Sequence, residues 1–356
     1  MKKILILAND VTTILQFRCE LISALVNDGN EVTVSVPEHE RTKEIEALGA
    51  KVVNTNVSRH GKNPFKDIKL YKDYIKLIKE IRPDIVLTFT IKPNVYGGMA
   101  CGRLKIPYVA NVTGLGVVGD KGLLQKLMLF LYKKGIKKAK CVFFQNKANK
   151  DFFESKGIVG KQGELLPGSG VNVEKFKYMD YPKDGVNNII FIGRIIRDKG
   201  VYELAEAAKN LEERADLKFT VLGDVEYGSE NPFIGLKNVE CVGYRKNVVD
   251  YLRDAHAIVL PSYHEGMANV LLEAASCGRV VIASNISGCQ ESFDEGKTGF
   301  GFEVRNADSL RAAINSFLSL SYEEKNTMGV AGRNKMEVEF DRNIVINKYR
   351  NQINTL

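Results

Sequence analysis

The chain has 356 residues, of which 44% are apolar and 26% are charged, so it can bury a sizeable core and its length favours two domains. No apolar run approaches the roughly 18 residues that a membrane-spanning helix needs. The net charge of +8 comes from the first half: residues 1–180 carry 30 Lys and Arg against 18 Asp and Glu, whereas residues 181–356 carry 21 against 25. Such a surplus attracts anions such as phospholipid head groups, nucleic acid or phosphorylated substrates.

The start of the chain and its cysteines indicate where the protein works. The apolar stretch at residues 4–8 is too short for the core of a secretion signal, so we expect a first strand there. The six cysteines form no CxxC pair, which favours reduced thiols and argues against a zinc site. We therefore expect a cytoplasmic protein, soluble or peripheral on the inner face of the cell membrane.

Short runs rich in Ile and Val alternate with amphipathic stretches through the first half of the chain. The expected strands are residues 2–8, 31–36, 51–57, 84–89, 107–112 and 141–146, and the expected helices are residues 15–28, 40–48, 67–81 and 96–104. This alternation predicts an α/β domain with a parallel, doubly wound sheet, whose ligand crevice lies at the carboxyl ends of the strands.

A polar segment with Pro and Gly at residues 178–187 separates this domain from a second one of the same kind. There the expected strands are residues 188–193, 218–223, 239–244, 257–262 and 280–285, and the expected helices are residues 200–214, 248–255, 270–277 and 309–320. The predicted domains are therefore residues 1–180 and 186–335. A final helix within residues 342–356 is free to pack back on the first domain.

The segment PSYHEGMANVLLEAASCG at residues 261–278 carries the strongest chemical signal. A strand ends at its beginning and a helix begins near Met267 or Ala268, with Glu265 before the helix and Glu273 on it. The N–H groups of Gly266 and the next two residues can point at an anion, with the helix dipole behind them. Two such acids on their own are more often solvated surface groups, so the context decides between the two interpretations.

A second signal is FIGRIIRDKG at residues 191–200, where a strand ends in Gly193 and is followed by Arg194 and Lys199. Arg binds phosphate oxygens with two parallel hydrogen bonds and Lys supplies a point charge. Together they suit a diphosphate and the charge that develops on a departing nucleoside diphosphate.

These two segments, in this order, resemble the signature of the retaining family 4 glycosyltransferases, in which two Glu eight residues apart follow a PS-x-x-E-G element. The resemblance implies the glycosyltransferase B fold, with two Rossmann-like domains and a cleft between them. It also implies a UDP-sugar donor held by the second domain, with Glu265, Arg194 and Lys199 as the catalytic residues. Glu273 would bind the ribose, and the diphosphate would meet the amides of Met267, Ala268, Asn269 and Val270.

Further donor contacts follow from the same resemblance. Gly193 and Gly266 would allow close approach of the donor, and His264 would lie near its sugar or phosphate. Tyr244 follows Gly243 where the family builds its nucleobase pocket from backbone. Asn172, in PGSGVNVEKF, replaces the acid usual in the family and is given no role.

The first domain is expected to bind the acceptor. Its first loop, NDVTTILQFR, lacks the paired glycines common in the family and, with TIKPN, NPF and VTGLG, resembles enzymes that elongate undecaprenyl-diphosphate-linked glycans, including N-acetylgalactosaminyltransferases. The acceptor-binding residues implied in this way are Arg18, Lys92, Asn94, Thr113 and Gly114.

Residues 121–140 contain seven lysines and no acids among many Leu and Phe side chains. Such a helix can lie on an anionic membrane, or it can be a core helix whose lysines extend to water, and periodicity favours neither. A lipid-linked acceptor favours the membrane.

The reaction predicted is the retaining, metal-independent transfer of a hexose or N-acetylhexosamine from a UDP-sugar to a lipid-linked glycan in surface polysaccharide or glycoprotein-glycan assembly. None of the four histidines has metal-ligand spacing, so no metal or other cofactor is expected. A nucleotide-sugar epimerase of the same fold is the nearest alternative. A nucleic-acid-binding protein is favoured by charge alone, so we expect no nucleic-acid partner, and a dinucleotide-dependent oxidoreductase is disfavoured because no G-x-G-x-x-G follows the first strand.

Overall fold

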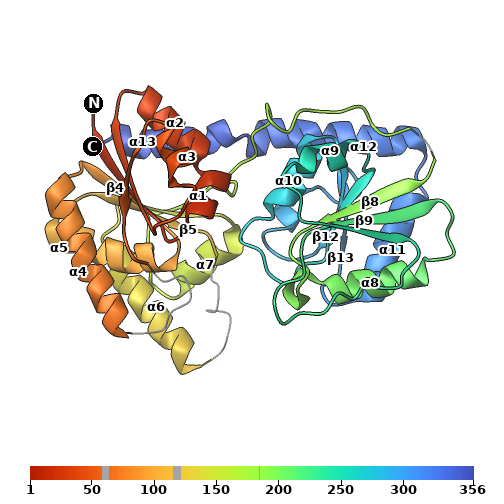
Figure 1. Cartoon of the computed structure of the whole chain (residues 1–356), viewed down its shortest axis with the longest axis horizontal. Coiled ribbons are helices and arrows are strands. Elements are labelled where there is room, and N and C mark those ends of the chain that lie inside the picture. Colours follow the sequence, from red (N-terminus) through yellow and green to blue (C-terminus); the bar gives the residue numbers. More distant parts are fainter. Residues whose placement is uncertain (58–63, 115–121, 184) are drawn as a thin grey trace. The chain divides into compact units, whose positions relative to one another are not determined.

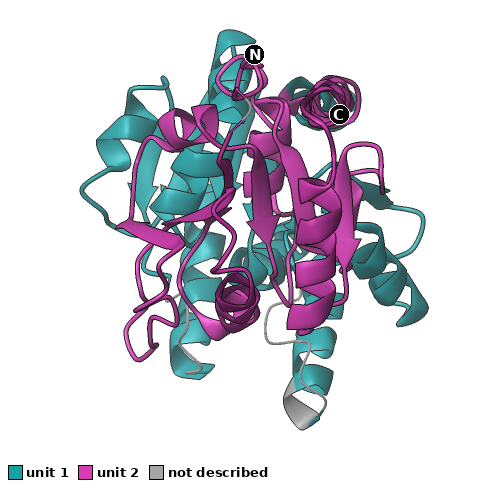
Figure 2. Cartoon of the chain, turned by 90° about the vertical axis from the view of Figure 1, so that its right-hand side faces the viewer, with its two compact units in different colours: residues 1–169, 343–356 teal, residues 170–342 magenta. Residues whose placement is uncertain are grey.

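A computed structural model of the chain describes residues 1–57, 64–114, 122–183 and 185–356. The chain forms two compact units, residues 1–169 with 343–356 and residues 170–342, which Figure 2 distinguishes by colour. Across the described ranges, none of the helices combines the length and the apolar character required to cross a membrane.

The first unit is built on a seven-stranded parallel sheet with the order β3-β2-β1-β4-β5-β6-β7. Its strands are β1 (Lys3–Leu7), β2 (Glu31–Val36), β3 (Lys51–Asn54), β4 (Ile85–Phe89), β5 (Tyr108–Val112), β6 (Cys141–Phe144) and β7 (Gly163–Leu165). Its helices are α1 (Val11–Phe17), α2 (Cys19–Asn27), α3 (Thr42–Glu46), α4 (Pro64–Ile81), the π-helix η1 (Pro93–Gly97), α5 (Gly98–Leu104), α6 (Leu123–Ile136), α7 (Lys147–Ser155) and α13 (Arg342–Asn354).

Helices cover both faces of this sheet, so its strands are apolar on both sides. In β1, Ile4 and Ile6 face a cluster with α1, α2, α3 and α13, whereas Leu5 and Leu7 face a cluster with α4 to α7 (Figure 1). This double burial explains the continuous apolar runs in the sequence, since a half-exposed strand would alternate with polar residues.

The second unit has a six-stranded parallel sheet with the order β10-β9-β8-β11-β12-β13. Its strands are β8 (Asn187–Ile192), β9 (Leu217–Leu222), β10 (Val239–Gly243), β11 (Ala257–Leu260), β12 (Val280–Ser284) and β13 (Gly299–Phe302). Its helices are η3 (Arg197–Lys199), α8 (Val201–Asn210), α9 (Val248–Arg253), α10 (Asn269–Ser276), η4 (Gln290–Ser292), α11 (Ala307–Leu318), α12 (Tyr322–Lys335) and the π-helix η5 (Met336–Phe340).

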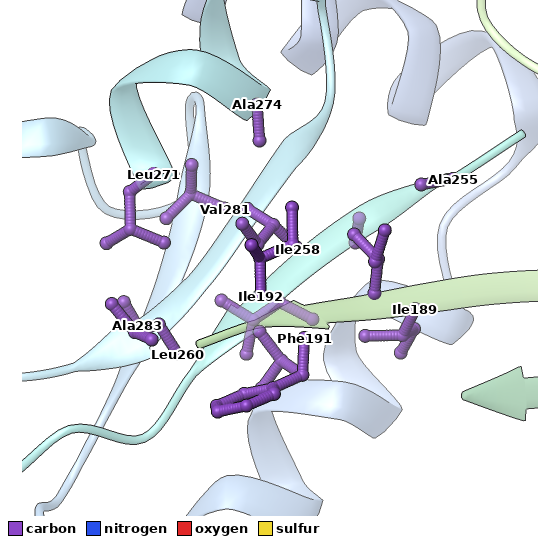
Figure 3. Close-up of a cluster of buried hydrophobic side chains, with 14 of the residues drawn as sticks. Ile189, Phe191, Ile192, Ala255, Ile258, Leu260, Leu271, Ala274, Val281 and Ala283 are labelled. Atoms are coloured by element: carbon purple, nitrogen blue, oxygen red, sulfur yellow. The ribbon is translucent and has the colours of Figure 1, made fainter. Parts of the chain in front are cut away.

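The core of the second unit lies directly behind its functional loops. Ile192 and Leu260, the last residues of β8 and β11, belong to a fully apolar cluster with Leu271 of α10 (Figure 3). Because close-packed interiors permit little displacement, this core fixes the points at which the loops leave the sheet.

Both sheets are parallel and doubly wound, which confirms the predicted fold class. The expected helix at residues 15–28 is wrong: α1 and α2 are separate because Arg18 leaves helical geometry, with φ −132° and ψ 1°. The strand β13 was missed because it reads GFGF, and Gly is rare in strands. Gly299 is needed there, since a Cβ atom would lie 2.3 Å from the carbonyl oxygen of Val281 on β12.

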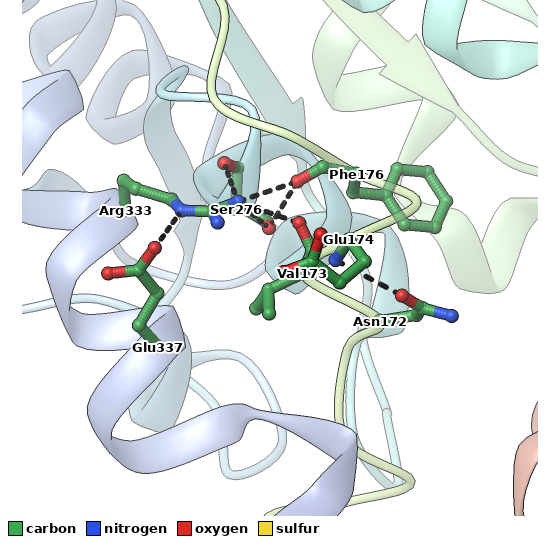
Figure 4. Close-up of polar contacts among 7 residues, drawn as sticks. All are labelled: Asn172, Val173, Glu174, Phe176, Ser276, Arg333 and Glu337. Atoms are coloured by element: carbon green, nitrogen blue, oxygen red, sulfur yellow. Dashed lines mark hydrogen bonds and ion pairs between the residues drawn. The ribbon is translucent and has the colours of Figure 1, made fainter.

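The boundary between the units lies at residue 169, not at residue 180 as expected. Residues 171–176 are tied to the second unit by Arg333 of α12, whose Nη1 donates to the carbonyl oxygens of Val173 at 3.1 Å and Phe176 at 2.8 Å (Figure 4). The same nitrogen reaches the carbonyl oxygen of Ser276 on α10 at 3.1 Å. Sequence composition marked the Pro- and Gly-containing segment, but it carries no information on these backbone contacts.

Candidate functional site

The second sheet reverses its strand order between β8 and β11. These strands lie side by side, although β9, β10 and the helices η3, α8 and α9 separate them in the chain. Ligands of open α/β sheets bind outside the carboxyl ends of the strands at such a point. The two signals found in the sequence follow these two strands: Gly193 and Arg194 come after β8, and Glu265 comes after β11.

Glycines bring the loops at this edge into direct contact. A Cβ atom on Gly200, which has φ +68°, would lie 2.0 Å from the carbonyl oxygen of Pro261. A Cβ atom on Gly223, with φ +145°, would lie 1.8 Å from the carbonyl oxygen of Gly193. Larger residues are excluded at both positions, because these distances are far shorter than any real contact and both backbones are left-handed.

Lys199 and Glu265 meet at the centre of this edge, although 66 residues separate them. The Nζ atom of Lys199 donates to Oε1 of Glu265, and the two side chains are 23% and 14% exposed. The thiol of Cys289 lies near this pair, and its pKa is raised well above the usual range by burial and by the charge of Glu265. The two residues thus form a partly buried, solvent-reachable pair of opposite charges.

Arg194 does not join this pair. Its Nη1 atom donates to Glu226 at 2.5 Å, and 63% of its side chain is exposed. An exposed ion pair of this kind contributes at most about 1 kcal/mol, so the guanidinium can be withdrawn from Glu226 at little cost.

The start of α10 partly fulfils the expectation of an anion-binding helix end. Helix α10 begins at Asn269, whose N–H donates to the carbonyl oxygen of Met267 at 3.0 Å. The Ala268 N–H, expected to be available, instead donates to the carbonyl oxygen of Gly288 at 2.8 Å. The N–H groups of Met267 and Val270 have no hydrogen-bond acceptor within the ranges that the structure describes.

Gly288 is a site residue that the sequence analysis missed. Its φ is +92°, and a Cβ atom there would lie 2.6 Å from the carbonyl oxygen of Glu265. It therefore supports both Glu265 and the helix start. A glycine three residues after the predicted strand at residues 280–285 was the only sequence signal, and such glycines usually mark ordinary turns.

Glu273 lies on α10, where it is partly buried. Burial raises its pKa to about 7, while the positive charges of Lys175 and Arg342 oppose the shift. Among the described residues none donates a hydrogen bond to this carboxyl group. Partial burial without a hydrogen-bond donor disfavours the charged form of this carboxylate, and a ligand that donates hydrogen bonds would favour it.

The other residues predicted to bind the sugar nucleotide lie on the surface or in the loops. Tyr244 is 67% exposed and His264 is exposed. The N–H of Tyr244 donates to Asp224 at 2.9 Å, and that of Gly193 pairs with the carbonyl oxygen of Leu222. Gly266 is partly exposed between Glu265 and the buried Met267.

In the first unit, two residues expected to bind the acceptor are buried. Arg18 is 4% exposed, and its guanidinium lies 4.7 Å from the ring centre of Phe89. Asn94 is fully buried, accepts from the Thr88 hydroxyl at 2.6 Å and donates to the Asn111 carbonyl oxygen at 2.7 Å. The side chain of Asn94 therefore joins β4, η1 and β5, and the guanidinium of Arg18 also donates to the carbonyl oxygen of Phe17 at 2.9 Å.

The remaining acceptor candidates are nearer to solvent. Lys92 is 14% exposed and pairs with Asp67 at 2.7 Å. Thr113 and Gly114 are partly exposed directly after β5. Asn63 of the NPF motif, residues 115–116 of VTGLG and Lys121 lie outside the described residues.

Two doubly wound parallel sheets in one chain define a two-domain α/β protein with a ligand crevice at the switch point of each sheet. Two family models match it: "Glycosyl transferases group 1" over residues 177–335 and "Glycosyl transferase 4-like" over residues 3–146. The chain therefore carries both halves of this type of enzyme.

Two curated relatives extend this similarity along the chain. The N,N'-diacetylbacillosaminyl-diphospho-undecaprenol alpha-1,3-N-acetylgalactosaminyltransferase of Campylobacter jejuni is 30% identical over 362 residues, which cover 95% of this chain and 94% of the relative. The UDP-Gal:alpha-D-GlcNAc-diphosphoundecaprenol alpha-1,3-galactosyltransferase of Escherichia coli is 29% identical over 301 residues, covering 76% and 75%. The chain belongs to the group 1, family 4-like glycosyltransferases.

Solved structures show the same fold. The crystal structure of Anabaena HepE in complex with UDP and glucose matches with a TM-score of 0.81 at 17% identity and covers 100% of both chains. This likeness confirms the glycosyltransferase B fold that the sequence motifs predicted.

Proposed function

We propose that this glycosyltransferase transfers an N-acetylhexosamine or hexose from a UDP-sugar to an undecaprenyl-diphosphate-linked glycan, with retention of anomeric configuration and without a metal ion. The observation that carries the proposal is the Lys199–Glu265 pair at the β8–β11 switch point. On the adjoining helix α10 lies the carboxyl group of Glu273, to which none of the described residues donates a hydrogen bond.

In this proposal the second unit holds the donor. Glu273 accepts hydrogen bonds from the two ribose hydroxyls, since none of the described residues donates to its carboxyl group. The free N–H groups of Met267 and Val270 bind diphosphate oxygens at the start of α10, where the helix dipole favours negative charge. Arg194 leaves its exposed pair with Glu226 to bind the same diphosphate.

The chemistry depends on charge stabilisation. An acceptor hydroxyl attacks the anomeric carbon from the side of the leaving group, and its proton passes to an oxygen of the departing UDP. Lys199 and Arg194 stabilise the charge that develops on that oxygen, while Glu265, released from Lys199, orients the sugar hydroxyls. No protein nucleophile is required for this route.

The substrate classes are supported by the relatives. The printed names of the Campylobacter jejuni and Escherichia coli enzymes both specify a diphospho-undecaprenol acceptor and an alpha-1,3 linkage, and the second specifies a UDP donor. N-acetylgalactosamine is therefore the first donor sugar to test, followed by galactose.

We also propose that α6 binds the membrane in which such an acceptor resides. Tyr132 and Ile136 are buried against the first unit, whereas Leu127 and Phe130 are 52% and 55% exposed. Four exposed lysines flank the two exposed apolar residues: Lys126, Lys133, Lys134 and Lys137. This arrangement suits the head-group region of an anionic bilayer, which accepts apolar side chains and attracts lysines.

Transfer to a synthetic polyprenyl-diphosphate-linked sugar tests the proposal. The protein is incubated with UDP-N-acetylgalactosamine, UDP-galactose, UDP-N-acetylglucosamine or UDP-glucose in the presence of EDTA, and the product is analysed by mass spectrometry and NMR. We expect one UDP-sugar to give an extended glycan with an α-anomeric linkage. A changed UDP-sugar without acceptor would indicate an epimerase, and a requirement for added divalent metal would contradict the metal-independent mechanism.

A further inference from the structure

Tyr263 lies two residues before Glu265 in the loop after β11, and it is only 6% exposed. Its N–H donates to the carbonyl oxygen of Asp198 in η3 at 2.8 Å. Its hydroxyl donates to Oε1 of Glu203, in the first turn of α8, at 2.6 Å. Tyr263 thus contacts the segment on both sides of Lys199.

These contacts join the same two loops that carry the charged pair. The loops also meet where Gly200 lies against the carbonyl oxygen of Pro261, and where Lys199 donates to Glu265. The distance between the lysine and the glutamate therefore depends on how firmly the two loops are held together. The long, rigid side chain of Tyr263 reaches from the loop after β11 to helix α8, which follows the loop that carries Lys199.

Two unfavourable features surround this tyrosine. Arg305 covers its ring at 4.5 Å while having φ +61°, a left-handed conformation that costs free energy in any residue except glycine. Glu203 keeps its second oxygen, Oε2, buried without a hydrogen-bond partner among the described residues. Strained and unsatisfied groups persist where the surrounding structure compensates for them, and they cluster at functional sites.

We infer that Tyr263 and Glu203 are positioning residues: they act through Lys199 and Glu265, by holding together the two loops that carry these groups at the donor site. The inference rests on the proposed donor site. Neither residue needs to touch the substrate, since the hydroxyl of Tyr263 is occupied by Glu203.

The direct test measures the reactivity of Lys199. Acetylation by an N-hydroxysuccinimide ester is followed for the peptide containing Lys199 by mass spectrometry, since an amine bound to a carboxylate reacts slowly. We expect Tyr263→Phe and Glu203→Ala to increase the rate at Lys199 several-fold. Glu203→Gln keeps an acceptor oxygen for the tyrosine and should restore the slow rate.

Tyr181→Phe is the matched control. It deletes another buried tyrosine hydroxyl, which donates to the carbonyl oxygen of His256 at 2.7 Å just before β11, at the amino end of the strand. This variant should leave the Lys199 rate unchanged, and its thermal unfolding shows the effect of losing such a hydrogen bond elsewhere in the same unit. An unchanged Lys199 rate in Tyr263→Phe, or an equal increase in Tyr181→Phe, would overturn the inference.

A kinetic measurement separates this inference from the proposed function. With a UDP-sugar that the wild type transfers, Tyr263→Phe should lower kcat by roughly tenfold with little change in the donor KM, because misplaced groups fail mainly in the transition state. A wild type that transfers no sugar contradicts the proposed function, whereas the acetylation rates still decide whether Tyr263 positions Lys199. Equal kcat values for wild type and Tyr263→Phe would show that the contact has no part in the transfer.

Discussion

The carboxyl group of Glu273 has a pKa of about 7 because burial penalises its charged form. In the proposed donor complex, a ribose diol donates hydrogen bonds to the ionised form of Glu273. Binding of the sugar donor should therefore lower this pKa, and the affinity should be lower where the free protein is protonated. The burial of Glu273 should therefore make the affinity for the sugar nucleotide depend on pH.

We expect the affinity for UDP-N-acetylgalactosamine to fall as the pH decreases through about 7, by up to about tenfold per unit below it. This ligand is suitable because its diphosphate diester does not titrate in that range. Calorimetric titrations at several pH values measure the effect, and Glu273→Gln should be weaker and independent of pH. A pH profile that is the same in both proteins would show that Glu273 does not contact the ligand.

The stability of the folded protein should depend on pH in the opposite direction. Because the pKa of Glu273 is higher in the folded protein than its ordinary value of 4.5, the folded state binds the proton more tightly, and stability decreases as the pH rises from about 4.5 to about 7. Ligand binding and folding are therefore favoured by different protonation states of one residue.

At the scale of elements, the segment at residues 171–176 depends on one side chain. The Nη1 atom of Arg333 also reaches Oγ of Ser276 at 3.0 Å, and its Nε atom pairs with Glu337 at 2.7 Å (Figure 4). This cluster joins the connecting segment to α10, the helix that carries Glu273.

We expect Arg333→Ala to destabilise the protein by about 2–4 kcal/mol, since it removes a donor that the carbonyl oxygens of Val173, Phe176 and Ser276 share. Urea unfolding measures the loss. Arg311→Ala removes an exposed arginine that pairs with Asp308, and it should cost less than about 0.5 kcal/mol. Similar losses in the two variants would contradict the role given to Arg333.

Helix α6 gives a second prediction at this scale. Replacing Leu127 and Phe130 together by Ser should reduce sedimentation with phosphatidylglycerol vesicles by about tenfold or more, because two partly exposed apolar side chains no longer enter the bilayer. Val338→Ser, which changes a 76% exposed apolar residue in the second unit, is the control and should bind like the wild type. Vesicle binding that persists in the double variant would exclude this face of α6.

The sequence predicted these elements unevenly. Continuous apolar runs located both sheets because double burial leaves a clear pattern, and the motif around Glu265 located the switch-point loop. The contacts of the polar residues could not be predicted from the sequence: Asn94 accepts from the Thr88 hydroxyl, and the guanidinium of Arg18 lies over the ring of Phe89. Gly288 supports the site from 23 residues beyond Glu265, a contact that only the folded chain defines.

For the whole molecule, the last helix determines which residues make up each unit. The chain leaves the first unit after Ser169 and returns to it at Asn343, so α13 completes a core that began with β1. Tyr349 is fully buried there, with its ring 5.0 Å from that of Phe143 and 6.0 Å from that of Phe89, and its hydroxyl accepts from Asn111.

We expect Tyr349→Ala to destabilise the first unit by about 3–5 kcal/mol, the usual cost of deleting a buried aromatic side chain. Hydrogen exchange followed by mass spectrometry should show faster exchange in β4, β5 and β6, while the strands of the second unit keep their protection. Increased exchange confined to the second unit would contradict the assignment of α13.

The central claim is that the second unit binds a nucleoside diphosphate at the edge where β8 and β11 end. Calorimetric titration of the whole protein with UDP, GDP and ADP in EDTA tests it most directly, using the wild type, Lys199→Ala, Glu273→Ala and the surface control Glu213→Ala. We expect UDP to bind tightly, both site variants to weaken this binding at least about tenfold, and the control variant to leave it unchanged. Absence of binding by all three nucleotides, or binding indifferent to Lys199 and Glu273, would contradict it.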